Sequence, residues 1–163
     1  MEQGRGAYLL DGDNLRCGIC GDLGFSQADR EANVHRVGEL ARLFADSGAI
    51  AVVAVVSPYE RTRTQVRERH AQDNLPFYEV FLDTPIAVCA ERDPKGLYAR
   101  ALAGELDGFT GIDDPYEQPP HPDLQLTPAM PVPLAVDAVL ELLRAHPAPD
   151  AVGLTTAGAS TRP

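Results

Sequence analysis

One uninterrupted apolar stretch constrains the fold of this chain more than any other feature of its sequence. Residues 50–56 read Ile-Ala-Val-Val-Ala-Val-Val, bounded by Gly48 on one side and by Ser57 and Pro58 on the other. β-Branched residues favour strands, and a run without polar alternation is typical of a strand that is covered on both faces. We therefore predict that this segment is a strand of a parallel sheet.

The remaining sequence alternates between predicted strands and predicted helices, which indicates a doubly wound α/β sheet. Further strands are predicted at residues 7–10, 77–82 and 123–126. Helices are predicted from a capping box at Ser26 to Gly48, over 60–71, from an N-cap at Thr84 with Pro85 at N1, over 97–103 and over 132–144. The length suits one domain, which we place at residues 1–146, followed by a tail at 147–163 that we expect to be disordered.

Charge and composition exclude several classes of protein. The formal net charge is −10, which argues against a nucleic-acid partner. No apolar run reaches the roughly 18 residues of a membrane span, and the start lacks a secretory signal, so we expect a cytoplasmic protein without a membrane partner. Three cysteines suit a reducing compartment. Cys17 and Cys20 have C-x-x-C spacing, but too few cysteines remain for a four-cysteine zinc site.

The predicted strand ends gather polar residues at one edge of the sheet, where ligands bind in such folds. Asp11 and Asp13 follow the first strand in the sequence Asp-Gly-Asp-Asn. Their carboxylates could hold Mg²⁺ or accept a proton from an attacking hydroxyl. The same four residues also favour a tight turn for local reasons, and taken alone they fit that interpretation better.

Arginines and loop aromatics stand near this edge. Arg16, Arg30, Arg36 and Arg63, with Asn33 on the same helix face as Arg30, suit a phosphate or sulfate group, or else form an ordinary solvated face. Two phenylalanines occupy loops flanked by glycine, and each either stacks on a base or fills a local apolar gap. They are Phe25 and Phe109.

Residues 95–117 have the features of a lid over the site. Four glycines allow hinge motion, and Lys95 and Arg100 could meet phosphates when the lid closes. The alternative is a long surface loop, although loops of this length in compact domains are usually functional or disordered.

Three blocks of the sequence together resemble adenylylsulfate kinase, namely residues 10–16 with 22–26, residues 30–46 and residues 81–117. The match runs from about residue 9 to residue 117 and less clearly to 144. Its most specific motifs are Asp-Pro-Lys-Gly-Leu-Tyr at 93–98 and Phe-Thr-Gly-Ile-Asp-Asp-Pro-Tyr-Glu at 109–117, combined with Asp-Gly-Asp-Asn at 11–14. The resemblance implies a P-loop-kinase-like doubly wound parallel sheet. It also implies transfer of phosphate from MgATP to the 3′-hydroxyl of adenosine 5′-phosphosulfate (APS), a reaction of sulfate assimilation, and it leaves a homodimer open.

The resemblance implies roles for particular residues. Asp11 and Asp13 match the family's acidic pair near the metal and the attacking hydroxyl, with Asp13 as the expected base. Residues that match the family's contacts to APS are Arg16, Phe25, Arg30, Asn33, Val56, Ser57, Lys95 and Phe109. In this set the two phenylalanines enclose the adenine and Lys95 is the lid lysine. Arg92 lies where the family approaches the ATP base.

The chain departs from the family pattern at its start. The family's first strand, its P-loop and the following helix need roughly 30 residues, and only six precede Ala7. The single lysine, Lys95, has no glycine before it and no Ser or Thr after it, so it is not a P-loop lysine. The family's first strand lies between the strands that here end at Ser57 and Asp83. We therefore expect two unpaired strand edges and at best marginal stability.

These observations leave alternatives. The leading interpretation is an APS kinase whose recorded sequence starts late or whose gene is truncated. A second is a non-catalytic protein that binds APS or pairs with a full-length kinase subunit, because the APS-side residues are present and the ATP-phosphate side is not. A third is another small-molecule kinase of the same architecture, which the two phenylalanines disfavour because they suit a nucleoside acceptor.

Overall fold

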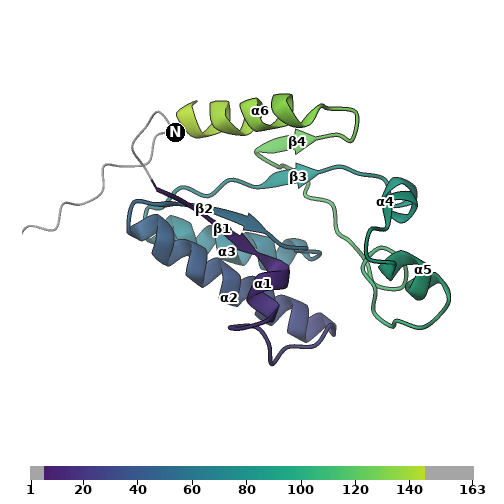
Figure 1. Ribbon diagram of the computed structural model, residues 1–163. Coiled ribbons are helices and arrows are strands. Elements are labelled where there is room, and N and C mark those ends of the chain that lie inside the picture. The colour runs from purple at the N-terminus through teal and green to yellow at the C-terminus, as the bar shows by residue number, and fades with distance from the viewer. Residues whose placement is uncertain (1–5, 146–163) are drawn as a thin grey trace, which may run out of the picture.

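The computed structural model describes residues 6–145 and contains two separate pairs of parallel strands (Figure 1). Strand β1 (Ala7–Asp11) pairs with β2 (Ile50–Ala54) along all five residues of each. Strand β3 (Val80–Leu82) pairs with β4 (Leu124–Leu126). Each pair is joined through helical segments, as parallel neighbours require. The predicted α/β class with parallel strands is therefore confirmed.

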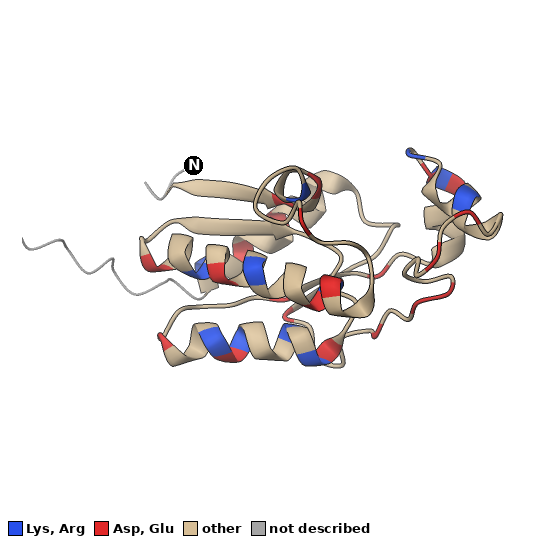
Figure 2. Ribbon diagram, turned by 90° about the horizontal axis from the view of Figure 1, so that it is seen from below, with Lys and Arg blue, Asp and Glu red and all other residues tan. Residues whose placement is uncertain are grey.

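Six helices complete this part of the chain. They are α1 (Gly12–Arg16), α2 (Gln27–Asp46), α3 (Glu60–Gln72), α4 (Ile86–Arg92), α5 (Leu97–Leu102) and α6 (Val132–Ala145). Helix α2 packs against β1, β2 and α3, whereas α6 packs against β4. Helices α4 and α5 project to one side of the strands (Figure 1). Acidic and basic residues are interspersed along the helices seen from below (Figure 2).

Local sequence signals set the ends of α2. The Ser26 side chain accepts a hydrogen bond from the backbone N–H of Asp29 at 3.2 Å, which caps the first turn. At the other end Gly48 adopts a φ of 85°, which glycine reaches without a steric penalty, and its N–H bonds to the carbonyl of Ala45. The helix predicted between Ser26 and Gly48 is thus confirmed.

The best-formed core lies between α2 and the first strand pair. Its buried members are Leu10, Cys20, Val37 and Ala41. Further apolar side chains pack around them, namely Leu15, Leu23, Leu40, Phe44, Ala51 and Val55. Because Leu10 directly precedes Asp11, this core fixes the strand end from which the first candidate site residues emerge.

The prediction that the second strand is covered on both faces is wrong for the described residues. Val52 is 49% exposed and Val53 is 41% exposed, because α2 covers β2 from one side and α6 packs on β4 instead. Strands β2 and β3 are not paired with each other, so each leaves one edge free within residues 6–145. The sheet is therefore interrupted at the place where the sequence leads us to expect two unpaired edges.

Some predicted boundaries also need correction. The strand predicted at 50–56 is shorter and ends at Ala54, as β2. The strand predicted at 77–82 is also shorter and begins only at Val80, as β3. The short helix α1 was not predicted. Thr84 is not the N-cap of α4: Pro85 holds that position with a ψ of 141°, and its carbonyl accepts the N–H of Val88. The helix at 132–144 is confirmed as α6, and the tail predicted at 147–163 lies outside the described residues.

Helices α2 and α3 approach each other closely at Gly38 and Val66, so a methyl group added at Gly38 should destabilise the protein rather than stabilise the helix. A Cβ built on Gly38 would lie 2.8 and 2.9 Å from the two γ-carbons of Val66, a stiff β-branched side chain. Alanine is preferred over glycine within helices by about 1 kcal/mol, but overpacking costs about 1–3 kcal/mol. We expect Gly38→Ala to lower the free energy of unfolding by about 1 kcal/mol, measured by urea denaturation.

The control is the double variant Gly38→Ala/Val66→Ala. If the clash is the cause, the double variant loses less stability than the sum of the two single variants. A stabilised Gly38→Ala would show that the two helices separate freely and would contradict the packing described above.

Candidate functional site

The acidic pair after β1 is divided between a carboxylate that caps a helix and an exposed carboxylate. Asp11 Oδ1 accepts hydrogen bonds from the backbone N–H groups of Asp13 and Asn14, both at 3.1 Å, and so caps α1. The turn interpretation therefore holds for this oxygen. The Asp13 side chain is 74% exposed and is not used as a cap. It is thus the carboxylate that is available for chemistry.

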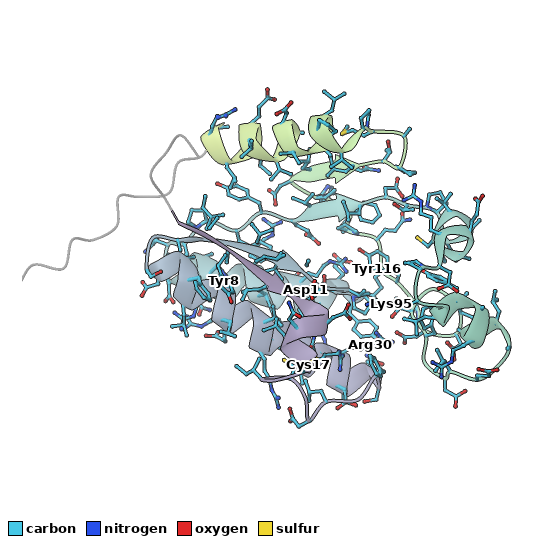
Figure 3. All side chains as sticks on the ribbon, in the orientation of Figure 1. Tyr8, Asp11, Cys17, Arg30, Lys95 and Tyr116 are labelled. Carbon is cyan, nitrogen blue, oxygen red and sulfur yellow. The ribbon has the colours of Figure 1, made fainter. Side chains whose placement is uncertain are left out.

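Lys95 reaches the same place from the segment between α4 and α5. Its ammonium group forms an ion pair with Asp13 Oδ2, and this contact raises the pKa of Lys95. Both side chains are exposed, so the ion pair contributes little free energy. An anionic ligand can therefore replace Asp13 as the partner of Lys95. Asp11, Arg30 and Lys95 lie near one another in this view, on the side of the first strand pair that faces α4 and α5 (Figure 3).

Arg16 lies against the ring of Phe25. Its Nη1 donates to the carbonyls of Leu23 at 3.1 Å and Gly24 at 2.9 Å, and its guanidinium carbon is 4.3 Å from the ring centroid. Cation–π attraction of this kind holds both groups in place. Phe25 remains 60% exposed. A large aromatic face is therefore open to solvent beside a fixed positive charge.

Arg30 joins the two loops that carry the phenylalanines. Its Nε donates to the carbonyl of Phe25 at 3.0 Å, and its Nη2 donates to the carbonyl of Gly108 at 2.6 Å. Phe109 follows directly and meets Tyr98 edge-on, with ring centroids 4.9 Å apart. The structure thus brings together the loops of Phe25 and Phe109, which are 84 positions apart in the sequence.

The remaining predicted site residues differ in their surroundings. Asn33 is 6% exposed, and its Oδ1 has no hydrogen-bond partner, an arrangement that is rare for a buried polar atom. Val56 and Ser57 follow the end of β2, where Val56 is 59% exposed. Arg92 is the exposed last residue of α4. None of these four residues is placed in contact with the Arg30 bridge by the described interactions.

Comparison with known proteins identifies the family. Residues 1–127 match the family described as "Adenylylsulphate kinase". An adenylyl-sulfate kinase from Enterobacter sp. (strain 638) is 52% identical over 143 residues, which cover 88% of this chain and 70% of that protein.

The chain belongs to the adenylylsulfate kinase family.

Solved structures agree with this membership. The Mycobacterium tuberculosis APS kinase CysC, in complex with AMPPNP and APS, is 50% identical and superimposes with a TM-score of 0.84, covering 88% of this chain and 83% of that one. A hexameric APS kinase from Thiobacillus denitrificans is 29% identical with a TM-score of 0.63, covering 88% of this chain and 23% of that one. Family membership makes this chain a kinase that uses ATP, and it confirms the predicted P-loop-kinase fold.

Two of the arginines considered as anion ligands serve the fold instead. Arg36 pairs with Asp22, with Nη2 and Oδ2 at 2.9 Å, and donates to the carbonyl of Ile19. Arg63 is only 6% exposed and donates to the carbonyls of Ser57 at 2.6 Å and Glu117 at 2.7 Å. Both guanidinium groups are therefore already engaged by other parts of the protein.

Arg63 also forms an ion pair with Glu79. Its Nε lies 2.6 Å from Glu79 Oε1, although neither atom has a hydrogen bond of acceptable geometry. On the next turn of α3, Arg67 Nη2 lies 2.7 Å from Asp123 Oδ2 and 3.4 Å from Glu79 Oε2. Since Glu79 and Asp123 directly precede β3 and β4, these arginines connect α3 to the second strand pair.

Sequence reasoning missed two residues of the segment proposed as a lid. The hydroxyl of Tyr59 lies 3.0 and 2.9 Å from the two carboxylate oxygens of Asp114. Asp113 accepts hydrogen bonds from the N–H groups of Gly108 and Phe109, which lower the pKa of its carboxyl group. The paired aspartates inside a glycine-rich stretch were the available signal for such a folded loop. Arg100, expected to meet phosphates, lies 3.4 Å from Glu105.

Among residues 6–145, no helix combines the length and the apolar character that crossing a membrane requires.

The structural role of Arg63 gives a prediction. Arg63→Met keeps much of the side-chain volume but removes the charge, and it leaves a half-buried carboxylate and two carbonyls without their partner. Breaking a buried pair costs about 3–5 kcal/mol, so we expect a loss near 3 kcal/mol because Arg67 still approaches Glu79. Urea denaturation measures it.

Arg61→Met on the same helix is the matched control. Its side chain is 68% exposed and pairs with Glu31, so little stability should be lost. Equal losses in the two variants would show that Arg63 acts only through the net charge of the helix.

Proposed function

We propose that this chain binds APS and takes part in the transfer of the terminal phosphoryl group of ATP to its 3′-hydroxyl, giving 3′-phosphoadenosine 5′-phosphosulfate (PAPS). The observation that carries the proposal is the bridge by Arg30 between the loops of Phe25 and Phe109. Two aromatic side chains held in adjacent loops suit a planar base. The relative from M. tuberculosis supports the same ligand, since its structure contains APS.

The phosphosulfate end of APS needs cationic and polar partners. We assign this role to Arg16, Arg30 and Asn33, with Lys95 contributing on closure of the lid. The buried Oδ1 of Asn33 supports a ligand contact because it lacks a protein partner. Val56 and Ser57, at the loop after β2, complete the APS side. Arg92 is proposed to approach the base of ATP.

Asp13 is the proposed general base. Its exposed carboxylate can accept the proton of the attacking 3′-hydroxyl once Lys95 has moved to an anionic ligand. Asp11 keeps this carboxylate in place, because it caps the helix on which Asp13 lies. Phosphoryl transfer of this kind depends mainly on positioning and on electrostatic stabilisation.

The donor set at this edge fits Mg²⁺ that arrives with ATP. Mg²⁺ is usually held by one or two carboxylates together with phosphates and waters, and Asp11 and Asp13 offer two carboxylates. Within the described residues no group of three or more His, Cys, Asp or Glu side chains could hold a metal without such help. When bound, Mg²⁺ would neutralise charge on the phosphates.

The 163 residues contain no G-x-x-x-x-G-K-[ST] motif, so no residue here is assigned to cradle the ATP phosphates. A second candidate function is binding of APS without turnover or pairing with a full-length kinase subunit. The edges of β2 and β3 that have no strand partner within residues 6–145 favour it. The deciding experiment measures PAPS formation by the purified chain with MgATP, alone and with an N-terminal P-loop unit joined to it.

The outcomes of that experiment are distinct. Product from the chain alone supports the complete activity. Product only after the P-loop unit is joined supports an acceptor site that needs an added phosphate cradle. No product in either case, with no heat of APS binding from a folded sample, rejects both candidate functions.

We further propose a cytoplasmic location and a homodimer. The free thiols of Cys17, Cys20 and Cys89 suit a reducing compartment.

A first prediction concerns APS affinity. Arg16→Ala removes a charge proposed to meet the phosphosulfate and also the partner of the Phe25 ring. Hydrogen bonds to charged groups contribute about 1.5–3 kcal/mol, so we expect the dissociation constant of APS to rise by at least tenfold in calorimetry. Arg36→Ala removes the same charge from a residue engaged with Asp22 and serves as the control. Similar weakening in both would indicate a non-specific charge effect.

A second prediction concerns turnover. In a chain with PAPS activity, Asp13→Asn retains the shape of the side chain but removes the base. We expect kcat to fall by about 10²-fold or more, while calorimetric APS binding changes by no more than about threefold. Asp22→Asn, outside the proposed site, is the control. An Asp13→Asn enzyme with unchanged kcat would assign the base elsewhere.

A further inference from the structure

Tyr59 makes a buried contact that the proposed chemistry does not use. It is 5% exposed and occupies the N-cap position of α3, immediately after the loop that contains Val56 and Ser57. Its hydroxyl lies 3.0 and 2.9 Å from the two oxygens of Asp114, which is 55 positions further along the chain. A hydroxyl bonded to a carboxylate out of solvent is a strong, directional contact.

Asp114 closes the loop that carries Phe109. Its carbonyl accepts the N–H of Gly111 at 2.7 Å, and its own N–H donates to the carbonyl of Phe109 at 3.3 Å. Its carboxylate lies 3.7 Å from Nε of Arg30, the residue that bridges the Phe25 and Phe109 loops. Asp114 therefore touches both the loop of one phenylalanine and the arginine that aligns the two.

A second set of contacts fixes the chain just beyond Asp114 to the same helix end. The N–H of Glu117 donates to the carbonyl of Pro58 at 2.7 Å, and the carboxylate of Glu117 accepts the N–H of Glu60 at 2.6 Å. Arg63 donates to the carbonyl of Glu117. The C-terminal end of the segment is thus tied to α3 on both sides of Tyr59.

At the other end of the same segment, the two cationic side chains make their ion pairs at the surface. The ion pairs that Lys95 and Arg100 make, with Asp13 and Glu105, are between exposed side chains. Exposed pairs of this kind break readily. The segment is therefore attached to α3 through the polar contacts of Asp114 and Glu117, whereas its ion pair with Asp13 is one that ligands can exchange.

We propose that Tyr59 is a positioning residue, whose hydroxyl holds Asp114 and thereby sets the Phe109 loop and Arg30 in the arrangement that receives the nucleoside of APS. This inference rests on the proposed function and names a residue outside the assigned binding set. Tyr59 acts through Asp114 and does not touch the ligand itself.

The state of the Tyr59 hydroxyl supports this role at all ordinary pH values. Burial, together with the hydrogen bond to Asp114, raises the pKa of Tyr59 to about 12. The hydroxyl therefore stays protonated and remains a donor throughout the range in which an enzyme of this family would be assayed. The contact is permanent rather than a pH-dependent switch.

The test uses Tyr59→Phe, which removes only the hydroxyl, in the form of the protein that makes PAPS. We expect KM for APS to rise about tenfold, the lower end for a hydrogen bond to a charged group. We expect kcat to stay within about twofold and KM for ATP to be unchanged. Amide hydrogen exchange should become faster at residues 108–114 and stay as it was in the core of α2.

Tyr8→Phe is the matched control, because Tyr8 is 56% exposed and stacks on Phe44 at the opposite end of β1. It should change neither KM nor exchange. Asp114→Asn, alone and combined with Tyr59→Phe, should show that the two effects are not additive, as for partners in one contact.

Two results would overturn the proposal. The first is Tyr59→Phe with unchanged KM for APS and unchanged exchange at 108–114. The second is faster exchange across the whole protein, including α2, in both Tyr59→Phe and Asp114→Asn, since this would reveal a general loss of stability. If the parent protein neither binds APS nor makes PAPS, the proposed function fails. The exchange data still decide whether Tyr59 holds the loop.

Discussion

The structure depends on the buried guanidinium of Arg63. Strands β2 and β3 do not pair within the described residues, so the two halves of the sheet have no ladder of hydrogen bonds between them. Arg63 replaces part of that connection, because it donates hydrogen bonds to the carbonyls of Ser57, after β2, and of Glu117, and forms an ion pair with Glu79 ahead of β3. Because the charge of Arg63 is buried, the loss of any one of its partners would leave an uncompensated charged or polar group in the interior.

The candidate site follows from that connection. The α3 end that Arg63 anchors is also the attachment point of the segment that ends at Glu117, and the loop of Phe109 lies within that segment. Arg30 connects this loop to the Phe25 loop by hydrogen bonds to both. Lys95, at the other end of the same segment, forms an ion pair with Asp13. The acceptor site is therefore assembled by long-range polar contacts on a scaffold whose apolar core lies mainly under β1.

Sequence signals predicted elements whose causes are local. The Ser26 cap and Gly48 bounded α2, and apolar periodicity identified α6. The motifs at 93–98 and 109–117 indicated the kinase family. The sequence did not reveal α1, a short helix that depends on a cap from Asp11, or the buried role of Arg63. Tyr59 and Asp114 were missed because no periodicity or motif links two residues so far apart; only the folded chain brings them together.

The free edges of β2 and β3 have a consequence for the behaviour of this chain in solution. Proteins commonly guard exposed strand edges with lysine, proline or an inward charge. The five residues of β2 and the three of β3 contain none of these. Within residues 6–145 no side chain of these two strands therefore opposes pairing with a strand of another molecule, which would favour self-association at high protein concentration.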